Sequence, residues 1–343
     1  MITSLPPGIV LMAGALLVAL LRGRMQQVVL LILPVLSALQ LLCLPHGTAL
    51  TVEAYGVQLT LVHIDKLSLV WGYIFHIAAF VSALYALHVK DTVQHVSALL
   101  YVGAAIGAVF AGDLVTLFVY WELTAISSVF LIWASRNEGS YRAGMRYLIW
   151  QVGSGVLLLS GIVLHYQATG SIDFMGPFYQ GKSVLAEFPW RSPGLGPVLI
   201  FLSFGIKAAF PLLHSWLPDA YPHATPSGSV FLSAFTTKLA IYTLARGFPG
   251  VECLIWIGAI MTAFPIFFAV IENDLRRVLS YSLNNQLGFM VVGIGIGTEL
   301  ALNGTAAHAF AHILYKALLF MSMGALLYRT GTTKGSELGG LYK

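Results

Sequence analysis

Apolar runs long enough to cross a lipid bilayer follow one another along almost the whole chain. A spanning helix needs about 20 apolar residues to cross roughly 30 Å of hydrocarbon. Hydrophobic residues make up 58% of the 343 residues and charged residues only 9%, whereas soluble domains have about 25% charged residues. The sequence therefore predicts an all-α, polytopic membrane protein with about 11 transmembrane helices. The candidate spans lie near residues 7–21, 28–44, 67–88, 93–111, 113–134, 142–166, 196–218, 224–247, 251–271, 277–297 and 301–328.

Two longer connections separate these spans. The stretch TVEAYGVQLTLVHID alternates apolar and polar residues around a glycine, which predicts a short surface hairpin between the second and third helices. Residues 167–195 form the other long loop. The first apolar run has no positively charged segment before it, and Arg22 and Arg24 follow it, so we interpret it as a retained spanning helix.

The basic residues indicate an orientation in the membrane. An external N-terminus places eleven of the 18 Lys and Arg residues on the cytoplasmic side and four outside, with three left in the membrane. The positive-inside rule therefore favours an external N-terminus and a cytoplasmic C-terminus in the cell membrane. The basic residues are dispersed and form no stripe with interleaved aromatics, which argues against a nucleic-acid partner.

Four ionisable residues lie deep inside the apolar runs: Glu122, Lys207, Lys238 and Lys316. A charge at bilayer depth is costly and persists where it pairs, faces water or moves protons. These residues are therefore the first candidates for function.

Prolines follow Lys207 closely in GIKAAFPLLHSWLPDAYPHATPSG. Pro211 cannot bond the carbonyl of Lys207 four residues earlier, so the seventh helix should be broken next to this lysine. Irregular backbone at membrane depth is tolerated where it lines a cavity, and broken helices mark ion sites in transporters.

Glu122 and Lys207 should both lie near the middle of the bilayer, where they could pair. Burial disfavours the charged form of a lysine, so Lys207 could accept and release a proton as its partner moves. The alternative is a static pair that locks two helices together. Lys238 is the next candidate along a proton path, and snorkelling is its alternative. Hydroxyl groups flank it at Ser233, Thr236, Thr237 and Tyr242.

His308, His312 and Lys316 recur every four residues, so they share one helix face over about 12 Å. Histidine titrates near neutrality and suits a proton relay, although both rings could simply be hydrogen-bonded inside the bundle. A haem site is disfavoured because no second helix carries matching histidines.

Several polar residues have local interpretations. Asp113 precedes an apolar run as a helix N-cap would, though it could also help to admit protons. Asp219 is expected to cap a half-helix, and His214 is either a relay group or a local cap. Arg276 and Arg277 are interpreted as topology anchors at the cytoplasmic surface.

The sequence contains no nucleotide, flavin or iron–sulfur motif. Its two cysteines, Cys43 and Cys253, have neither disulfide nor metal-ligand spacing. We therefore expect no cofactor and no metal.

Four motifs in order carry a family resemblance: WEL with Glu122, GIKAAFPLLHSWLPDAYPHATPSGSVFLSAFTTK, DLRRVLSYSLNNQLGFM and HAFAHILYKALLFM. Together they resemble the antiporter-like proton-translocating subunits of respiratory complex I, membrane-bound hydrogenases and Mrp-type cation/proton antiporters, from about residue 65 onward. The segment SAFTTKLAIYTLARGFPG looks most like the D-type subunit of the Mrp antiporters.

The resemblance implies roles for individual residues. The glutamate of the family's fifth helix corresponds to Glu122, the lysine of its broken helix to Lys207 and its bridging lysine to Lys238. The polar face of its eleventh helix corresponds to His308, His312 and Lys316.

The resemblance also implies inverted five-helix repeats. The first would cover 93–247 and a partial second 251–343, after three N-terminal helices in 1–92. Family members usually have about fourteen helices, so the second repeat is incomplete here, and either the sequence is truncated or a partner chain supplies the rest.

The function implied is proton translocation within a multi-subunit Na⁺/H⁺ antiporter, with other membrane subunits as partners. Two alternatives remain: the same kind of subunit in a redox-driven proton pump, and a structural helix bundle whose buried ions only fix packing.

Overall fold

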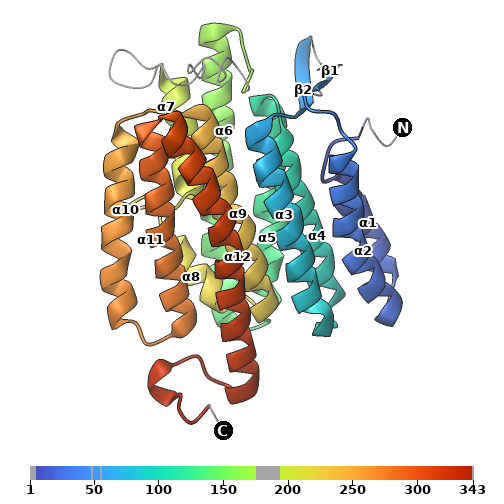
Figure 1. Ribbon diagram of the computed structural model, residues 1–343, viewed down its shortest axis with the longest axis vertical. Helices are drawn as coiled ribbons and strands as arrows, with labels where there is room; N and C mark the ends of the chain where they lie inside the picture. The colour runs from blue at the N-terminus through green and yellow to red at the C-terminus, as the bar shows by residue number, and fades with distance from the viewer. Residues whose placement is uncertain (1–4, 48, 55, 175–193, 342–343) are drawn as a thin grey trace.

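The computed structural model describes residues 5–47, 49–54, 56–174 and 194–341. In these ranges the chain forms twelve α-helices and one β-hairpin, and most of the helices run side by side in a bundle (Figure 1). The helices are α1 (Ile9–Leu20), α2 (Gly23–Leu42), α3 (Lys66–Tyr85), α4 (Thr92–Phe110), α5 (Leu114–Trp133), α6 (Glu138–Thr169), α7 (Leu195–Lys207), α8 (Trp216–His223), α9 (Pro226–Gly247), α10 (Cys253–Ile271), α11 (Leu275–Ile296) and α12 (Glu299–Thr330). The strands are β1 (Ala49–Ala54) and β2 (Val57–His63).

The predicted all-α, multi-pass membrane architecture is confirmed. Eight helices of the described chain are long and apolar enough to cross a membrane, against eleven predicted spans. The other three predicted spans correspond to the 12-residue α1, to the interrupted pair α7 and α8, and to α11. The first half of α11 is rich in arginine, serine and asparagine.

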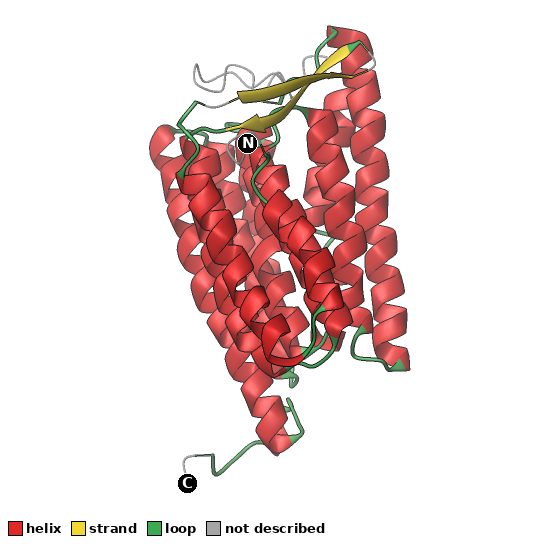
Figure 2. Cartoon of the chain, turned by 90° about the vertical axis from the view of Figure 1, so that its right-hand side faces the viewer, coloured by secondary structure: helices red, strands yellow, loops and turns green. Residues whose placement is uncertain are grey.

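The predicted hairpin is present at one end of the bundle, where its strands lie across the helix ends (Figure 2). Its strands pair antiparallel, with Ala54 opposite Val57. The carboxylate of Asp113 accepts a hydrogen bond from the backbone N–H of Thr60 at 2.8 Å, which ties β2 to the start of α5. Of the predicted loop at residues 167–195, α6 includes the first three residues, and 175–193 lie outside the described residues.

The seventh helix is broken next to Lys207, as predicted. Helix α7 ends at Lys207, Pro211 lies in the break, and α8 begins at Trp216. The indole N–H of Trp216 donates to the carbonyl of Ile206 at 3.0 Å, which satisfies one of the groups freed by the break. Ala209 adopts a left-handed conformation with φ 62°, which turns the chain away from the helix axis.

The later prolines of this segment do not break helices. Pro218 and Pro222 both lie within α8, and Pro226 occupies the first turn of α9. A proline at the start of a helix removes an N–H that has no intrahelical partner, so this position is favourable.

Helix α9 lies at the centre of the bundle. Its apolar stretch is 100% buried by the rest of the chain, whereas that of α10, at one edge of the bundle in Figure 1, is only 22% buried. Polar residues on α9 are therefore surrounded by protein rather than by lipid.

Candidate functional site

Lys207, the last residue of α7, is 1% exposed and is held by α5. Its Nζ donates to the carbonyl of Trp121 at 3.0 Å and to Thr124 Oγ1 at 2.9 Å. The same ammonium lies 4.0 Å from the centroid of the Trp121 ring, within reach of a cation–π interaction. The break after Lys207 therefore presents its side chain to residues on both sides of Glu122.

Glu122 is half-buried on α5 and interacts electrostatically with Lys207. The two side chains do not form the direct ion pair that the sequence suggested, because no salt bridge within 4.0 Å joins them in the described structure. Atom Oε1 of Glu122 is buried and has no hydrogen-bond partner among the described residues. Lys207 thus bonds to neutral oxygens while a carboxylate lies close by.

A cluster of hydroxyl groups, of which the sequence analysis named only Thr236, joins α4, α5, α6 and α9. Its members are Tyr101, Ser128, Tyr147 and Thr236, each at most 3% exposed. The hydroxyls of Ser128 and Tyr147 lie 2.8 Å apart, Tyr147 also interacts with Thr236, and Thr236 bonds to Tyr101. Ser128 lies one helical turn beyond Thr124, the residue that holds Lys207. This hydroxyl cluster therefore extends from the surroundings of Lys207 toward the helix that carries Lys238.

Lys238 is fully buried in the middle of α9. Its ammonium donates to the carbonyl of Ser233 on the same helix, and its own carbonyl accepts from the Trp71 indole at 3.1 Å. The neighbouring Thr237 hydroxyl is buried and has no hydrogen-bond partner in the described structure. The snorkelling alternative is excluded for this geometry, because the side chain is enclosed by protein.

Two of the three residues on the predicted polar face of α12, His312 and Lys316, are buried inside the bundle. His312 and Lys316 are 0% and 1% exposed, and both interact electrostatically with Lys238. Lys316 Nζ donates to Ser282 Oγ at 2.9 Å, whereas both ring nitrogens of His312 have no partner among the described residues. His308 is half-buried and contacts Gln286 at 3.0 Å. The rings of His308 and His312 lie 6.0 Å apart.

The structure therefore brings the predicted residues together in two groups. Glu122 and Lys207 form one, and Lys238 together with His308, His312 and Lys316 of α12 forms the other. Among the described residues no direct contact joins Lys207 to Lys238.

The accessory candidates have different outcomes. Asp113 is an N-cap, as expected, and accepts the backbone N–H of Thr116 at 2.7 Å. Asp219 does not cap α8 but forms two hydrogen bonds to Arg146 of α6, at 2.7 and 2.9 Å. His214 packs against Phe264, with its Nδ1 buried and without a partner in the described part of the chain.

A buried ion pair between Asp65 and Arg246 was not predicted. Asp65 is the N-cap of α3, and its two carboxylate oxygens accept from Arg246 at 2.7 and 2.8 Å. Burial acts to raise the pKa of Asp65, but the hydrogen bonds and charge of Arg246 outweigh it and hold this pKa at about 2. The two residues are 181 positions apart, so no local pattern could reveal the pair.

Arg276 is not a surface anchor, contrary to the sequence interpretation. It is 6% exposed and donates to the carbonyls of Tyr221 and Ala224, at 3.2 and 2.6 Å, and to Ser229. These carbonyls belong to the end of α8, so the guanidinium caps this helix and joins it to α11. Arg277, the next residue, does lie at the surface, 3.7 Å from Glu272.

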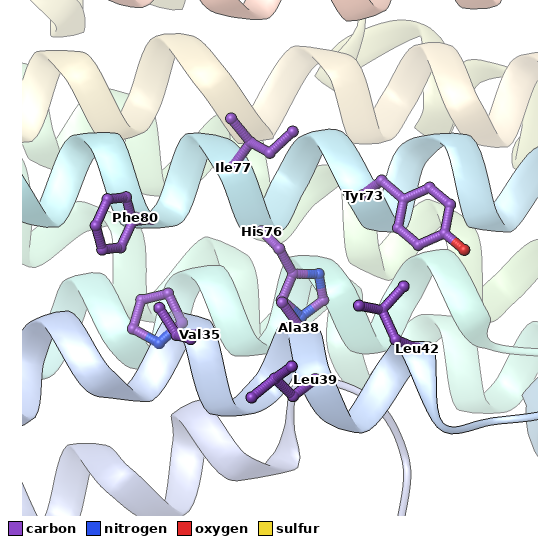
Figure 3. A pocket seen from close by; sticks show the side chains of 9 residues that line it. Val35, Ala38, Leu39, Leu42, Tyr73, His76, Ile77 and Phe80 are labelled. Carbon is purple, nitrogen blue, oxygen red and sulfur yellow. The ribbon is translucent and has the colours of Figure 1, made fainter.

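One open cavity of about 410 Å³ lies apart from this site, between α2 and α3 (Figure 3). Apolar side chains line it, together with His76, whose ring bonds to Ser37 at 2.9 Å and to the Gly72 carbonyl at 2.7 Å. In the described ranges, no three His, Cys, Asp or Glu side chains come together in a way that could hold a metal ion.

Comparison with known proteins agrees with this geometry. Residues 111–343 match the family described as NADH:quinone oxidoreductase/Mrp antiporter, TM. The chain is 32% identical over 251 residues to the N-type subunit of the NADH-quinone oxidoreductase of Desulforudis audaxviator, and 32% identical over 252 residues to the D-type subunit of the Na(+)/H(+) antiporter of Alkalihalophilus pseudofirmus. Each match covers 69% of this chain and 49% of the relative, so the chain spans about half the length of these curated relatives.

Solved structures show the same fold. The Mrp complex of Dietzia sp. DQ12-45-1b contains a chain that superposes with a TM-score of 0.86 at 29% identity, covering 98% of this chain and 39% of that one. Respiratory complex I of Thermus thermophilus contains one with a TM-score of 0.75 at 20% identity, covering 93% of this chain and 70% of that one. From the matched residues and the buried lysines together, the chain belongs to the NADH:quinone oxidoreductase/Mrp antiporter transmembrane family.

Proposed function

We propose that this chain is a proton-translocating subunit of a multi-subunit monovalent cation/H⁺ antiporter that exchanges Na⁺. The similarity to the D-type subunit of an Na(+)/H(+) antiporter and to a chain of the Mrp complex supports this branch of the family. Other membrane subunits would be its partners. The chain itself would supply an intramembrane path for protons.

The observation that carries the proposal is the burial of three lysines that form no direct salt bridge. Lys207, Lys238 and Lys316 are each at most 1% exposed. None of them takes part in a salt bridge within 4.0 Å in the described structure. A buried ammonium that no carboxylate contacts directly is costly, so each lysine can take up and release a proton instead of staying permanently charged.

The proton would move from Lys207 to Lys238 and then to the α12 face. When the carboxylate of Glu122 is close, it favours the charged form of Lys207, and when it moves away, Lys207 releases its proton. The hydroxyl cluster offers groups that both donate and accept hydrogen bonds toward α9. From Lys238 the proton would pass to the α12 face of His308, His312 and Lys316, all three of which interact electrostatically with Lys238.

The proposal includes an orientation and an internal symmetry. The N-terminus would lie outside the cell membrane and the C-terminus in the cytoplasm, in accordance with the distribution of basic residues. The helices of 93–247 would form one repeat, and those of 251–343 would form part of an inverted second repeat, after the N-terminal helices of 1–92.

A redox-driven proton pump is the second candidate, because the chain is equally similar to a subunit of NADH-quinone oxidoreductase. Purification of the complex from membranes discriminates the two. Subunits that carry iron–sulfur clusters or bind quinone would co-purify with a redox pump and not with an exchanger.

The test is the substitution Lys207→Ala in the complete complex. We expect exchange driven by a pH gradient in membrane vesicles to be abolished while the complex remains assembled. Lys66→Ala, at an exposed position in the first turn of α3, is the control and should retain exchange. Undiminished exchange in Lys207→Ala would refute the proposed role. Full activity after charge-neutral replacement of both Glu122 and Lys207 would favour a purely structural bundle.

A further inference from the structure

The carboxylate of Glu122 occupies space that a glycine of α6 leaves open. A Cβ atom built on Gly155 would lie 1.3 Å from Glu122 Oε1, 2.4 Å from Cδ and 3.1 Å from Cγ. No side chain larger than hydrogen fits at this position unless the carboxylate moves. The same Oε1 is buried and lacks a hydrogen-bond partner in the described structure, so the contact with Gly155 is one of close packing.

Other glycines of α6 have different surroundings. A Cβ atom on Gly161 would meet Ile200 and the Gly196 carbonyl of α7, as expected where two helix backbones approach closely. One on Gly144 would meet the ring of Trp133. A Cβ atom on Gly153 would have no heavy atom within 4 Å. At Gly155 the three nearest atoms all belong to one ionisable side chain, and this distinguishes it from the packing glycines.

The residue before Gly155 holds the other half of the Glu122–Lys207 group. Ser154 Oγ accepts the indole N–H of Trp121 at 2.9 Å and is itself bonded to the Ser203 carbonyl of α7 at 2.9 Å. The Trp121 ring and carbonyl in turn hold the ammonium of Lys207. Two consecutive residues of α6 therefore contact this group. Ser154 bonds to Trp121, which holds Lys207, and Gly155 packs against the carboxylate of Glu122.

We propose that Gly155 is a positioning residue for Glu122, which keeps the carboxylate seated against α6 at a fixed separation from Lys207. This inference rests on the proposed role of Glu122 in proton translocation. A methyl group at position 155 would push the Glu122 carboxylate away from α6. Because the displaced atoms are the far end of a flexible side chain, the fold would adapt at little cost, whereas the coupling of Glu122 to Lys207 would change.

The experiment compares Gly155→Ala with Gly153→Ala in the complete complex in membrane vesicles. The first readout is modification of Glu122 by dicyclohexylcarbodiimide, which reacts with carboxyl groups in apolar surroundings, with Glu122→Gln as the background. We expect Gly155→Ala to be modified faster than the wild type and Gly153→Ala to react at the wild-type rate. An unchanged modification rate in Gly155→Ala would overturn the inference, whatever the transport result.

The second readout is the exchange rate. Displacement of a reacting group by about 1 Å can reduce rates by up to about 100-fold, so we expect Gly155→Ala to lose about tenfold or more in exchange. Gly153→Ala should keep the wild-type rate. Faster modification of Gly155→Ala with unchanged exchange would also overturn the inference, because the position of the Glu122 carboxylate against Gly155 would then have no influence on transport.

A third comparison separates positioning from helix packing. Glu122→Asp shortens the side chain and withdraws it from the seat, so adding Gly155→Ala to that variant should reduce exchange far less than it does in the wild type. An equal fold-loss in both backgrounds would assign Gly155 to helix packing and contradict the proposal. If Glu122→Gln leaves exchange intact, the proposed function fails, while the modification rates still decide whether Gly155 seats the carboxylate.

Discussion

Lys207 is held by Trp121 from two directions, with its ammonium 3.0 Å from the backbone carbonyl and 4.0 Å from the centroid of the indole ring. Both contacts favour the charged form of Lys207, but neither the carbonyl nor the indole ring carries a negative charge that would compensate the ammonium. In the proposed function, the approach of the Glu122 carboxylate adds to these contacts and favours the charged form of Lys207, and its withdrawal lets Lys207 release a proton. A permanent ion pair at this point would be a poorer proton carrier.

The hydroxyl cluster should matter for transport if it conducts protons from Lys207 toward α9. Tyr147→Phe removes the hydroxyl that bonds to Ser128 at 2.8 Å but keeps the buried ring. We expect the exchange rate to fall by about tenfold or more, within the range that single proton-transfer groups contribute. Tyr141→Phe on the same helix is the matched control, because Tyr141 is 59% exposed, and it should be silent. Equal rates in the two variants would exclude the cluster from the path.

Two adjacent arginines should differ sharply in their contribution to stability. Arg276→Ala leaves the carbonyls at the end of α8 without their buried donor, and we expect the free energy of unfolding to fall by about 2 to 4 kcal/mol. Arg277 is a surface residue, 43% exposed, so Arg277→Ala should change the free energy by about 0.5 kcal/mol or less. Unfolding titrations in detergent micelles measure both values. Similar losses in the free energy of unfolding for the two variants would show that the contacts of Arg276 with the end of α8 do not contribute to stability.

The buried pair of Asp65 and Arg246 should contribute far more to the free energy of unfolding than an exposed pair does. Asp65→Asn keeps a capping side chain on α3 but leaves Arg246, which is 1% exposed, without its counter-ion, and we expect a loss of about 3 to 5 kcal/mol. Asp91→Asn is the control, since Asp91 also caps a helix and pairs with the 73%-exposed Arg136. Its cost should be about 1 kcal/mol or less. The same detergent titration distinguishes the two.

The Asp65 carboxylate also predicts a pH dependence of stability. Its pKa is about 2 in the folded chain against an ordinary value of 3.8, so the folded state favours the ionised form. The resulting stabilisation, about 2 kcal/mol, is complete above about pH 4 and is lost as the pH falls toward about 2. Unfolding curves across this acidic range should show this loss in the wild type and lack it in Asp65→Asn. Parallel pH profiles for the two proteins would contradict the assignment.

The sequence predicted those features that depend on local pattern. Hydropathy marked the helices, alternation marked the hairpin, and Pro211 marked the break beside Lys207. The burial of Lys238 and Lys316 followed from the position of each within an apolar run.

Features that depend on tertiary partners could not be predicted. The hydrogen bonds between Arg246 and Asp65, between Arg146 and Asp219 and between Lys207 and Trp121 form only when elements far apart in the sequence pack together. Arg276 looks like any basic residue at a helix start, because its partners are backbone carbonyls with no sequence signature. Hydroxyl groups such as those of Tyr147 and Thr236 are common in helices and reveal a cluster only through the fold.

The most direct test of the account is Lys238→Met in the complete complex, followed by both thermal stability and pH-gradient-driven exchange in vesicles. Lys238 is fully buried with no carboxylate partner in the described structure, so an apolar side chain of similar length should leave stability unchanged or increase it. If the buried lysines carry protons, exchange should nevertheless fall by about 100-fold or more. A stable complex that exchanges at the wild-type rate without this lysine would contradict the proposed proton path.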